Sequence, residues 1–256
     1  MKQEKIISVM KRYELKYLLN KEQLNYFVNK INEHMKVDKY GVTSIASIYY
    51  DSPDYRLITK SIEKPKYKEK LRLRGYGLVN KDKPTFLEIK RKCEGIVYKR
   101  RITLTENEAT NLITNKESKS KDQISRELLA FIENYKNLEP KYLIIYDRVA
   151  YYQDNSDLRI TIDMNPRYRT THLNLHTSME GEPLLEEGSA ILEVKVQHSV
   201  PLWLTEILTK GHIYQSSFSK VGTAHLKELA KARNKNDYIL DAVINMKGEN
   251  SYGLAI

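Results

Sequence analysis

The chain has few of the residues that cross-link small domains or form flexible linkers. Among 256 residues there are one cysteine, Cys93, ten glycines and seven prolines. A single cysteine excludes an internal disulfide and cannot by itself supply the ligands of a zinc site. The sequence also lacks repeats and low-complexity tracts, so we expect one domain and not several domains joined by linkers.

Long apolar runs are absent as well. No stretch reaches the roughly 20 consecutive apolar residues that a membrane-spanning helix needs. The N-terminal segment 1–10 lacks the apolar core of a signal peptide. We therefore expect a cytoplasmic protein. A hydrophobic content of 41% is sufficient for a core, so the chain is expected to fold.

The charge of the chain is unbalanced toward basic residues. Lys and Arg number 43 and Asp and Glu number 33, giving a formal net charge of +10. This excess predicts an anionic partner, which by charge alone is nucleic acid, a membrane surface or a small polyphosphate. Specific nucleic-acid binding is disfavoured, because the sequence has no helix-turn-helix, RNP or zinc-finger signature.

Alternating apolar and polar residues predict eight strands, because successive side chains of a strand point to opposite faces. These runs are 10–18, 43–50, 67–76, 85–92, 96–105, 141–152, 158–163 and 190–197. Helical patterns are found at 21–35, 54–62, 106–114, 124–135, 202–209 and about 219–232. Short links such as 92–95 join strands directly, which favours an antiparallel sheet or barrel.

The polar faces of five predicted strands are mostly basic. They carry Arg12, Glu14 and Lys16; Lys70, Arg72 and Arg74; Glu88, Lys90 and Lys92; Lys99 and Arg101; and Glu193 and Lys195. Exposure to solvent explains one such face, but five of them favour a barrel whose charged faces point inward and whose apolar faces are covered by helices. Unpaired buried charge is costly, so this interior is stable only around an anion and metal ions. About eight strands can close around one small ligand.

Nine segments carry a resemblance to a known family. They are RYELKY at 12–17, IYYD at 48–51, KLRLRGYG at 70–77, FLEIK at 86–90, KRR at 99–101, YDR at 146–148, LRITID at 158–163, LEVK at 192–195 and FSK at 218–220. In this order they resemble the VTC-type polyphosphate polymerase domain of the triphosphate tunnel metalloenzyme, or CYTH-like, superfamily. The resemblance implies an α+β fold, with an eight-stranded antiparallel β tunnel and surrounding helices.

The resemblance also implies site residues. The catalytic phosphate contacts match Lys16, Arg72, Arg74, Lys90, Lys99, Arg148, Arg159 and Lys220. Further substrate contacts are expected at Arg12, Arg101, Lys195 and Ser219. Glu193 matches the metal-binding glutamate, and Glu14 and Glu88 are lesser candidates for holding Mn²⁺ or Mg²⁺.

The implied activity is transfer of the ATP γ-phosphate to a growing polyphosphate chain. The sequence departs from its relatives at two positions: Ser217 replaces the first lysine of a Lys-Phe-Ser-Lys stretch of the polymerases, and Arg12 replaces the first glutamate of the CYTH Glu-x-Glu-x-Lys motif. The second departure argues against the hydrolytic branch. Two alternatives stay open, namely a metal-dependent triphosphatase or tripolyphosphatase and a non-catalytic polyphosphate-binding module.

We expect the tunnel domain to occupy residues 1–236 and a C-terminal tail to occupy 237–256. The tail begins with an apolar stretch, 238–244, that is too short to span a membrane. It either docks on a separately encoded membrane protein, which would hold the domain at the inner face of the membrane, or completes the domain as a final helix or strand.

Overall fold

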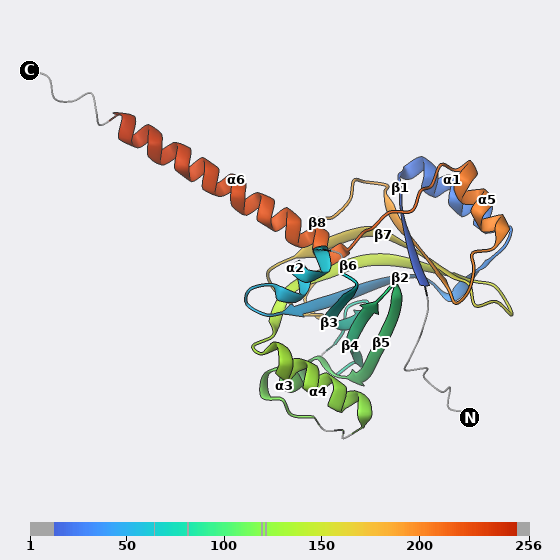
Figure 1. Ribbon diagram of the computed structural model, residues 1–256, viewed down its shortest axis with the longest axis horizontal. Coiled ribbons are helices and arrows are strands. Elements are labelled where there is room, and N and C mark those ends of the chain that lie inside the picture. The colour runs from blue at the N-terminus through green and yellow to red at the C-terminus, as the bar shows by residue number, and fades with distance from the viewer. Residues whose placement is uncertain (1–12, 64, 81, 119, 121, 250–256) are drawn as a thin grey trace, which may run out of the picture.

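A computed structural model describes residues 13–63, 65–80, 82–118, 120 and 122–249 (Figure 1). These residues form nine strands and six helices. In chain order they are β1 (Tyr13–Leu19), α1 (Lys21–Ile31), β2 (Lys36–Asp51), α2 (Arg56–Ile62), β3 (Tyr67–Tyr76), β4 (Thr85–Cys93), β5 (Ile96–Leu104), α3 (Glu106–Asn115), α4 (Gln123–Tyr135), β6 (Glu139–Tyr152), β7 (Arg159–Arg169), β8 (Glu182–Pro183), β9 (Ala190–Val196), α5 (Leu202–Lys210) and α6 (Lys220–Glu249).

Each predicted strand and helix is present, but two strands are longer than predicted. β2 begins at Lys36 and crosses Gly41, whose φ of +57° lies within a register shift against β6. β7 continues past Asp163 through Pro166, a residue that strand propensity disfavours. Pairing with β6 and the two-residue β8 holds this extension. Neither extension has a clear alternating pattern, so the sequence did not indicate them.

All strand pairs are antiparallel, in the order β1-β9-β7-β6-β2-β3-β4-β5, with β8 paired to β7. This confirms the predicted α+β fold. Within the described residues, hydrogen bonds do not close the sheet between its edges, β1 and β5. The two edges nevertheless contact each other, and Lys90 on β4 pairs with Glu14 on β1 at 2.9 Å. The sheet is therefore curved, with its charged side chains on the concave face.

Helices cover the apolar, convex face of the sheet, as predicted. On one side Leu128 of α4 packs with Leu71 and Ile89 from β3 and β4. On the other side Phe27 of α1 and Leu204 of α5 pack over β1, β7 and β9. The helix α3 packs beside α4 in the cluster that contains Leu71. Figure 1 shows the pair α3 and α4 at one end of the sheet and the pair α1 and α5 at the other. Because strand side chains alternate, burying Leu71 outward turns Lys70 and Arg72 inward.

Part of the concave face is filled by apolar side chains. Ile58 of α2 and Val221 of α6 pack on Tyr142 and Ile144 of β6. Asp51, from the IYYD segment, positions α2, because its carboxylate accepts hydrogen bonds from the first backbone N–H groups of that helix at 2.8 Å. These contacts narrow the space under the sheet to a tunnel.

The last helix crosses the expected boundary between domain and tail. The backbone of α6 is helical from Lys220 to Glu249 and extends away from the sheet (Figure 1). Positions 250–256 of the expected tail lie outside the described residues. Among the helices that are described, none is long and apolar enough to span a bilayer.

Candidate functional site

A cavity of about 500 Å³ lies between the concave face of the sheet and the segment 215–220 that leads into α6. Two carboxylates, Glu14 and Glu193, line it beside eleven basic side chains. The basic residues are Lys16, Lys68, Lys70, Arg72, Arg74, Lys90, Lys92, Lys99, Arg148, Lys195 and Lys220. So many positively charged side chains in one cavity with little exposure to solvent favour the binding of a multiply charged anion.

Glu193 on β9 lies among several cations of the cavity. Its carboxylate oxygens are 3.3 Å from Lys16 Nζ, 3.1 Å from Lys195 Nζ and 3.4 Å from an Arg148 guanidinium nitrogen. Burial alone would raise the pKa of the Glu193 carboxyl, but Lys16 and Lys195 hold it well below its usual value. Glu193 is therefore an ionised carboxylate inside the tunnel.

Glu14 and Glu88 have different surroundings. Glu14 lies 2.9 Å from Lys90 Nζ and 3.6 Å from Lys16 Nζ, so it shares Lys16 with Glu193. Burial opposes its ionisation, but Lys90 keeps the pKa of the Glu14 carboxyl well below its usual value. Glu88 is fully buried and is neutralised by Arg72 at 2.8 Å and Lys99 at 2.5 Å.

The pair Glu14 and Glu193 fits a divalent cation. Mg²⁺ and Mn²⁺ take hard oxygen ligands, and Mg²⁺ in phosphate enzymes is usually held by one or two carboxylates together with substrate phosphates. In the part of the chain that is described, no three Asp, Glu, His or Cys side chains gather to hold a metal alone. The residues therefore fit a metal whose coordination is completed by substrate, and Glu88 fits less well because it is fully buried and does not line the cavity.

Two arginines from the KLRLRGYG segment are held in fixed orientations. The Arg72 guanidinium donates to Glu88 at 2.8 Å and to the Tyr49 hydroxyl at 3.1 Å. Arg74 donates to the Tyr146 hydroxyl at 3.0 Å. A planar guanidinium fork binds phosphate oxygens in pairs, so arginines that are already oriented lose less entropy on binding.

Asp163 is a structural member of the site that the sequence analysis did not single out. It is fully buried and accepts two hydrogen bonds from Arg148, at 2.5 and 2.7 Å, as well as one from Lys220. The sequence signal was available, since Asp163 ends the LRITID segment and alternates with Ile160 and Ile162. Lys70, Tyr49 and Tyr146 also line the cavity without having been assigned a role.

Most of the predicted site residues that the structure describes lie together. Those that line the cavity are Glu14, Lys16, Arg72, Arg74, Lys90, Lys99, Arg148, Glu193, Lys195, Ser219 and Lys220. Glu88 lies behind them, against Arg72 and Lys99.

Two predicted phosphate contacts among the described residues are not brought into this group, Arg159 and Arg101. Arg159 donates to the backbone carbonyls of Ser156 and Leu158, both at 2.8 Å, because it lies where β7 begins and its guanidinium caps the preceding turn. Arg101 stacks on the Phe86 ring at 4.5 Å. Arg12 lies outside the described residues.

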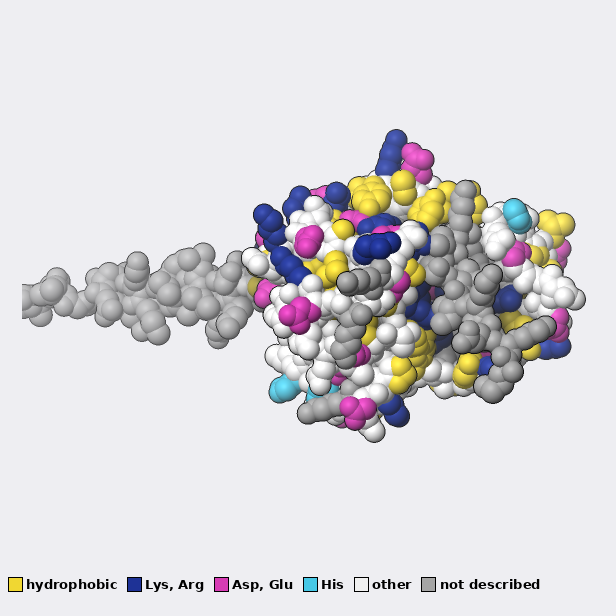
Figure 2. Space-filling view, turned by 90° about the horizontal axis from the view of Figure 1, so that it is seen from below, with side chains coloured by type: hydrophobic (Ala, Val, Ile, Leu, Met, Phe, Trp, Pro, Cys, Tyr) yellow, Lys and Arg dark blue, Asp and Glu magenta, His cyan; other side chains and the backbone are white. Residues whose placement is uncertain are grey.

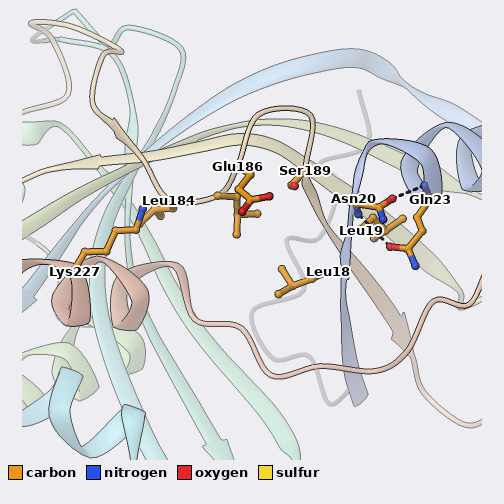
Figure 3. A pocket seen from close by; sticks show the side chains of 9 residues that line it. Leu18, Leu19, Asn20, Gln23, Leu184, Glu186, Ser189 and Lys227 are labelled. Atoms are coloured by element: carbon orange, nitrogen blue, oxygen red, sulfur yellow. Dashed lines mark hydrogen bonds between the residues drawn. The ribbon is translucent and has the colours of Figure 1, made fainter. Parts of the chain in front are cut away.

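A second hollow, of about 560 Å³, lies beside the start of α1 (Figure 3). Leu18 and Asn20 face Leu184 and Glu186 across it, and its lining has one basic residue, Lys227. On the face that Figure 2 shows, Lys and Arg side chains are interspersed with Asp and Glu. The tunnel cavity therefore has a larger excess of basic residues than this second hollow, and we place the candidate site in the tunnel.

Two lysines of the cavity have surroundings that disfavour their charge. Burial lowers the pKa of Lys70 well below its usual value, and neighbouring cations lower it further. These cations are Lys16, Lys90, Lys68 and Arg72. The partner of Lys70 is a neutral group, the Ser219 hydroxyl at 2.8 Å. Burial also lowers the pKa of Lys99 to about 7, although Glu88 acts in the opposite direction.

Binding of tripolyphosphate is expected to take up protons near pH 8. The phosphate charge favours the ammonium form of Lys70 and Lys99 and raises their pKa values, so each amine that is neutral in the free protein gains a proton. Affinity therefore falls as the pH rises toward the usual lysine pKa of 10.5. Titration calorimetry without metal, in buffers of different ionisation enthalpy, measures the uptake. Lys70→Met should reduce it, and equal uptake in the variant would show that Lys70 is already charged.

Comparison with solved structures identifies proteins of similar fold. A candidate adenylate cyclase from Bacillus halodurans has a TM-score of 0.51 at 14% identity, over 83% of this chain and 96% of that one. A candidate adenylyl cyclase from Hippeastrum, described as having a dominant triphosphatase activity, has a TM-score of 0.51 at 15% identity, over 83% and 93% of the two chains. At these identities the likeness shows a shared fold.

Comparison at the level of sequence identifies the family. No curated protein matches the chain. The profile described as "VTC domain" matches residues 11–227, which include all of the cavity-lining side chains. The segments that carried the resemblance therefore lie within one continuous match, and the chain belongs to the VTC domain family.

Proposed function

We propose that this chain is a metal-dependent polyphosphate polymerase, which transfers the γ-phosphate of ATP to the end of a polyphosphate chain. The observation that carries the proposal is the tunnel cavity, with eleven basic side chains and two carboxylates. Membership of the VTC domain family supports it, whereas the triphosphatase activity described for the Hippeastrum protein of similar fold favours the competing hydrolysis.

The proposed reaction breaks the bond between the β- and γ-phosphates of ATP and releases ADP. A terminal oxygen of the acceptor chain forms the new P–O–P bond. This oxygen is already anionic, so the protein need not supply a base for it. Phosphoryl transfer depends mainly on positioning and on neutralising charge at the reacting phosphates.

The side chains of the cavity divide this work between them. Arg72 and Arg74 hold phosphate oxygens in a fixed geometry, and Lys16, Lys90 and Lys220 supply mobile positive charge around them. Glu14 and Glu193 would hold Mn²⁺ or Mg²⁺, which when bound adds positive charge at the phosphates. Lys16 lies within 3.6 Å of both carboxylates, so it keeps the two in one region of the tunnel.

Use of water as the acceptor, as in a triphosphatase, would need a base. Four carboxylates in or behind the cavity have pKa values held below normal, despite burial, by adjacent cations, which makes them weak bases. They are Glu14, Glu88, Asp163 and Glu193. The amines of Lys70 and Lys99 are better bases, and so hydrolysis is the competing activity that the experiment must distinguish.

Purified protein incubated with ATP and Mn²⁺ is expected to form a ladder of polyphosphate on a gel and to release ADP. Matched samples lack the metal or contain EDTA, and these should form no chain. Release of inorganic phosphate without chains would assign the tunnel to a triphosphatase. Binding of polyphosphate without any ATP turnover would assign it to a binding module.

A further inference from the structure

Two aromatic rings and an arginine form a group at the end of β3, beside Arg74. Phe86 on β4 is directly opposite Arg74, and Tyr76 follows Arg74 by two residues, so strand alternation turns both rings toward the concave face. The two rings meet edge to face, with their centroids 5.8 Å apart. The Arg101 guanidinium lies over the Phe86 ring at 4.5 Å. We call Tyr76, Phe86 and Arg101 the aromatic platform.

Arg101 does not pair with the carboxylate that lies opposite it. In the register of β4 and β5 this carboxylate is Glu88, which pairs instead with Arg72 and Lys99. Among the residues that the structure describes, Arg101 forms no ion pair, and its contact is the face of the Phe86 ring. A guanidinium held against a ring presents a flat, positively charged surface to a further planar group.

The platform is accessible to solvent. Tyr76 is 46% exposed, and Phe86 and Arg101 are partly buried. A single exposed aromatic side chain on a protein surface needs no explanation. Here, however, two rings and a guanidinium adjoin Arg74, which is proposed to hold phosphate. Their combination at this place indicates a surface for a planar group that is attached to a phosphate.

The position of the platform relative to the cavity matches the shape of a nucleoside triphosphate. Arg74 and Lys99 line the cavity, whereas the three platform residues do not. Arg101 follows Lys99 by two residues on β5, a distance of about 7 Å at about 3.3 Å per residue. A base that is joined to its α-phosphate through a ribose lies at a comparable distance from the phosphates. Phosphates held by Arg72 and Arg74 would therefore place the base at the platform.

We propose that the aromatic platform stacks with the nucleobase of the ATP donor. This inference rests on the proposed function in taking a nucleoside triphosphate as the donor, and it names the side chains that distinguish a nucleotide from a bare triphosphate. Nucleobases stack on aromatic rings and on guanidinium planes through the faces of their own rings. Stacking recognises the presence of a base and not the groups at its edge, so the platform accepts ATP and GTP alike.

The test measures binding of ATP, GTP and tripolyphosphate to the double variant Tyr76→Leu/Arg101→Lys, by titration calorimetry without metal. The variant loses both stacking surfaces and keeps its charge. We expect affinity for ATP and for GTP to fall about tenfold, because stacking of one base contributes a factor of this size. Affinity for tripolyphosphate should change less than about twofold, since lysine retains the positive charge. Arg101→Lys alone should show a smaller loss in the same direction, and it decides the test if the double variant does not fold.

The matched control is Tyr40→Leu/Arg56→Lys, which makes the same two exchanges at exposed positions that do not line the cavity. It should leave all three affinities unchanged. Equal losses for ATP and tripolyphosphate in a folded variant would place Tyr76 and Arg101 at the phosphates. A loss for ATP without one for GTP would indicate recognition of the base edge, and unchanged binding would show that both side chains are merely solvated; each of these results overturns the platform. Failure of the proposed function is separable, because a wild-type protein that forms no chain from ATP can still show, or lack, the base-dependent binding.

Discussion

Replacement of Glu193 by glutamine is expected to lower metal-dependent turnover of ATP more than about a hundredfold. Loss of a group that only supports a metal ligand already costs about 10- to 100-fold, and Glu193 is proposed to be a ligand itself. The substitution keeps the volume of the side chain and removes one negative charge from a region that holds Lys16, Lys195 and Arg148. Binding of tripolyphosphate without metal should therefore survive.

Turnover is measured as chain or phosphate formed, and metal binding as the electron paramagnetic resonance signal of Mn²⁺ with tripolyphosphate present. Both should fall in Glu193→Gln. Glu182→Gln is the matched control, because Glu182 pairs with Lys231 at the surface and is 59% exposed. Turnover in the variant close to that of the wild type, or wild-type turnover in EDTA, would contradict a role for Glu193 as a metal ligand.

Replacement of Asp163 by asparagine is expected to lower the free energy of unfolding by about 3–5 kcal/mol, because breaking a buried ion pair from one side leaves the other charge uncompensated. Asp163 is fully buried, and it neutralises Arg148 through two hydrogen bonds and Lys220 through a third. No other carboxylate among the described residues is as close to Arg148, since Glu193 lies 3.4 Å away. Urea denaturation followed by circular dichroism measures the change.

Tripolyphosphate provides a test of this explanation. Binding of an anion stabilises any protein that binds it, by about 2.7 kcal/mol at a concentration a hundredfold above its Kd. If the anion also neutralises Arg148 and Lys220, the same tripolyphosphate concentration should stabilise Asp163→Asn more than the wild type. Asp154→Asn is the control, because Asp154 pairs with Lys36 but is 61% exposed, and its loss should cost less than about 1 kcal/mol. Equal stability of Asp163→Asn and the wild type would mean that Arg148 and Lys220 find solvent or another partner.

The local patterns of the sequence were sufficient to predict the strands, the helices and the direction in which side chains point. Leu71 and Leu73 alternate with Lys70, Arg72 and Arg74, and a strand with one apolar face buries that face whatever its partners are. This is why the inward orientation of the basic residues could be predicted before the pairing of the strands. The family match also depends on these segments and their order.

The tertiary structure decided which charges meet. Glu14, Glu88 and Glu193 have similar sequence surroundings, but the pairing of β1 with β9 brings the first and last together, whereas β3 and β5 enclose Glu88 with Arg72 and Lys99. Strand alternation predicts that Arg159 points into the concave side of the sheet, but its guanidinium donates hydrogen bonds to backbone carbonyls outside the cavity group. The register of the strands and the neutralisation of buried charge depend on residues that are far apart in the chain. The sequence around any one of these residues therefore does not predict its partner.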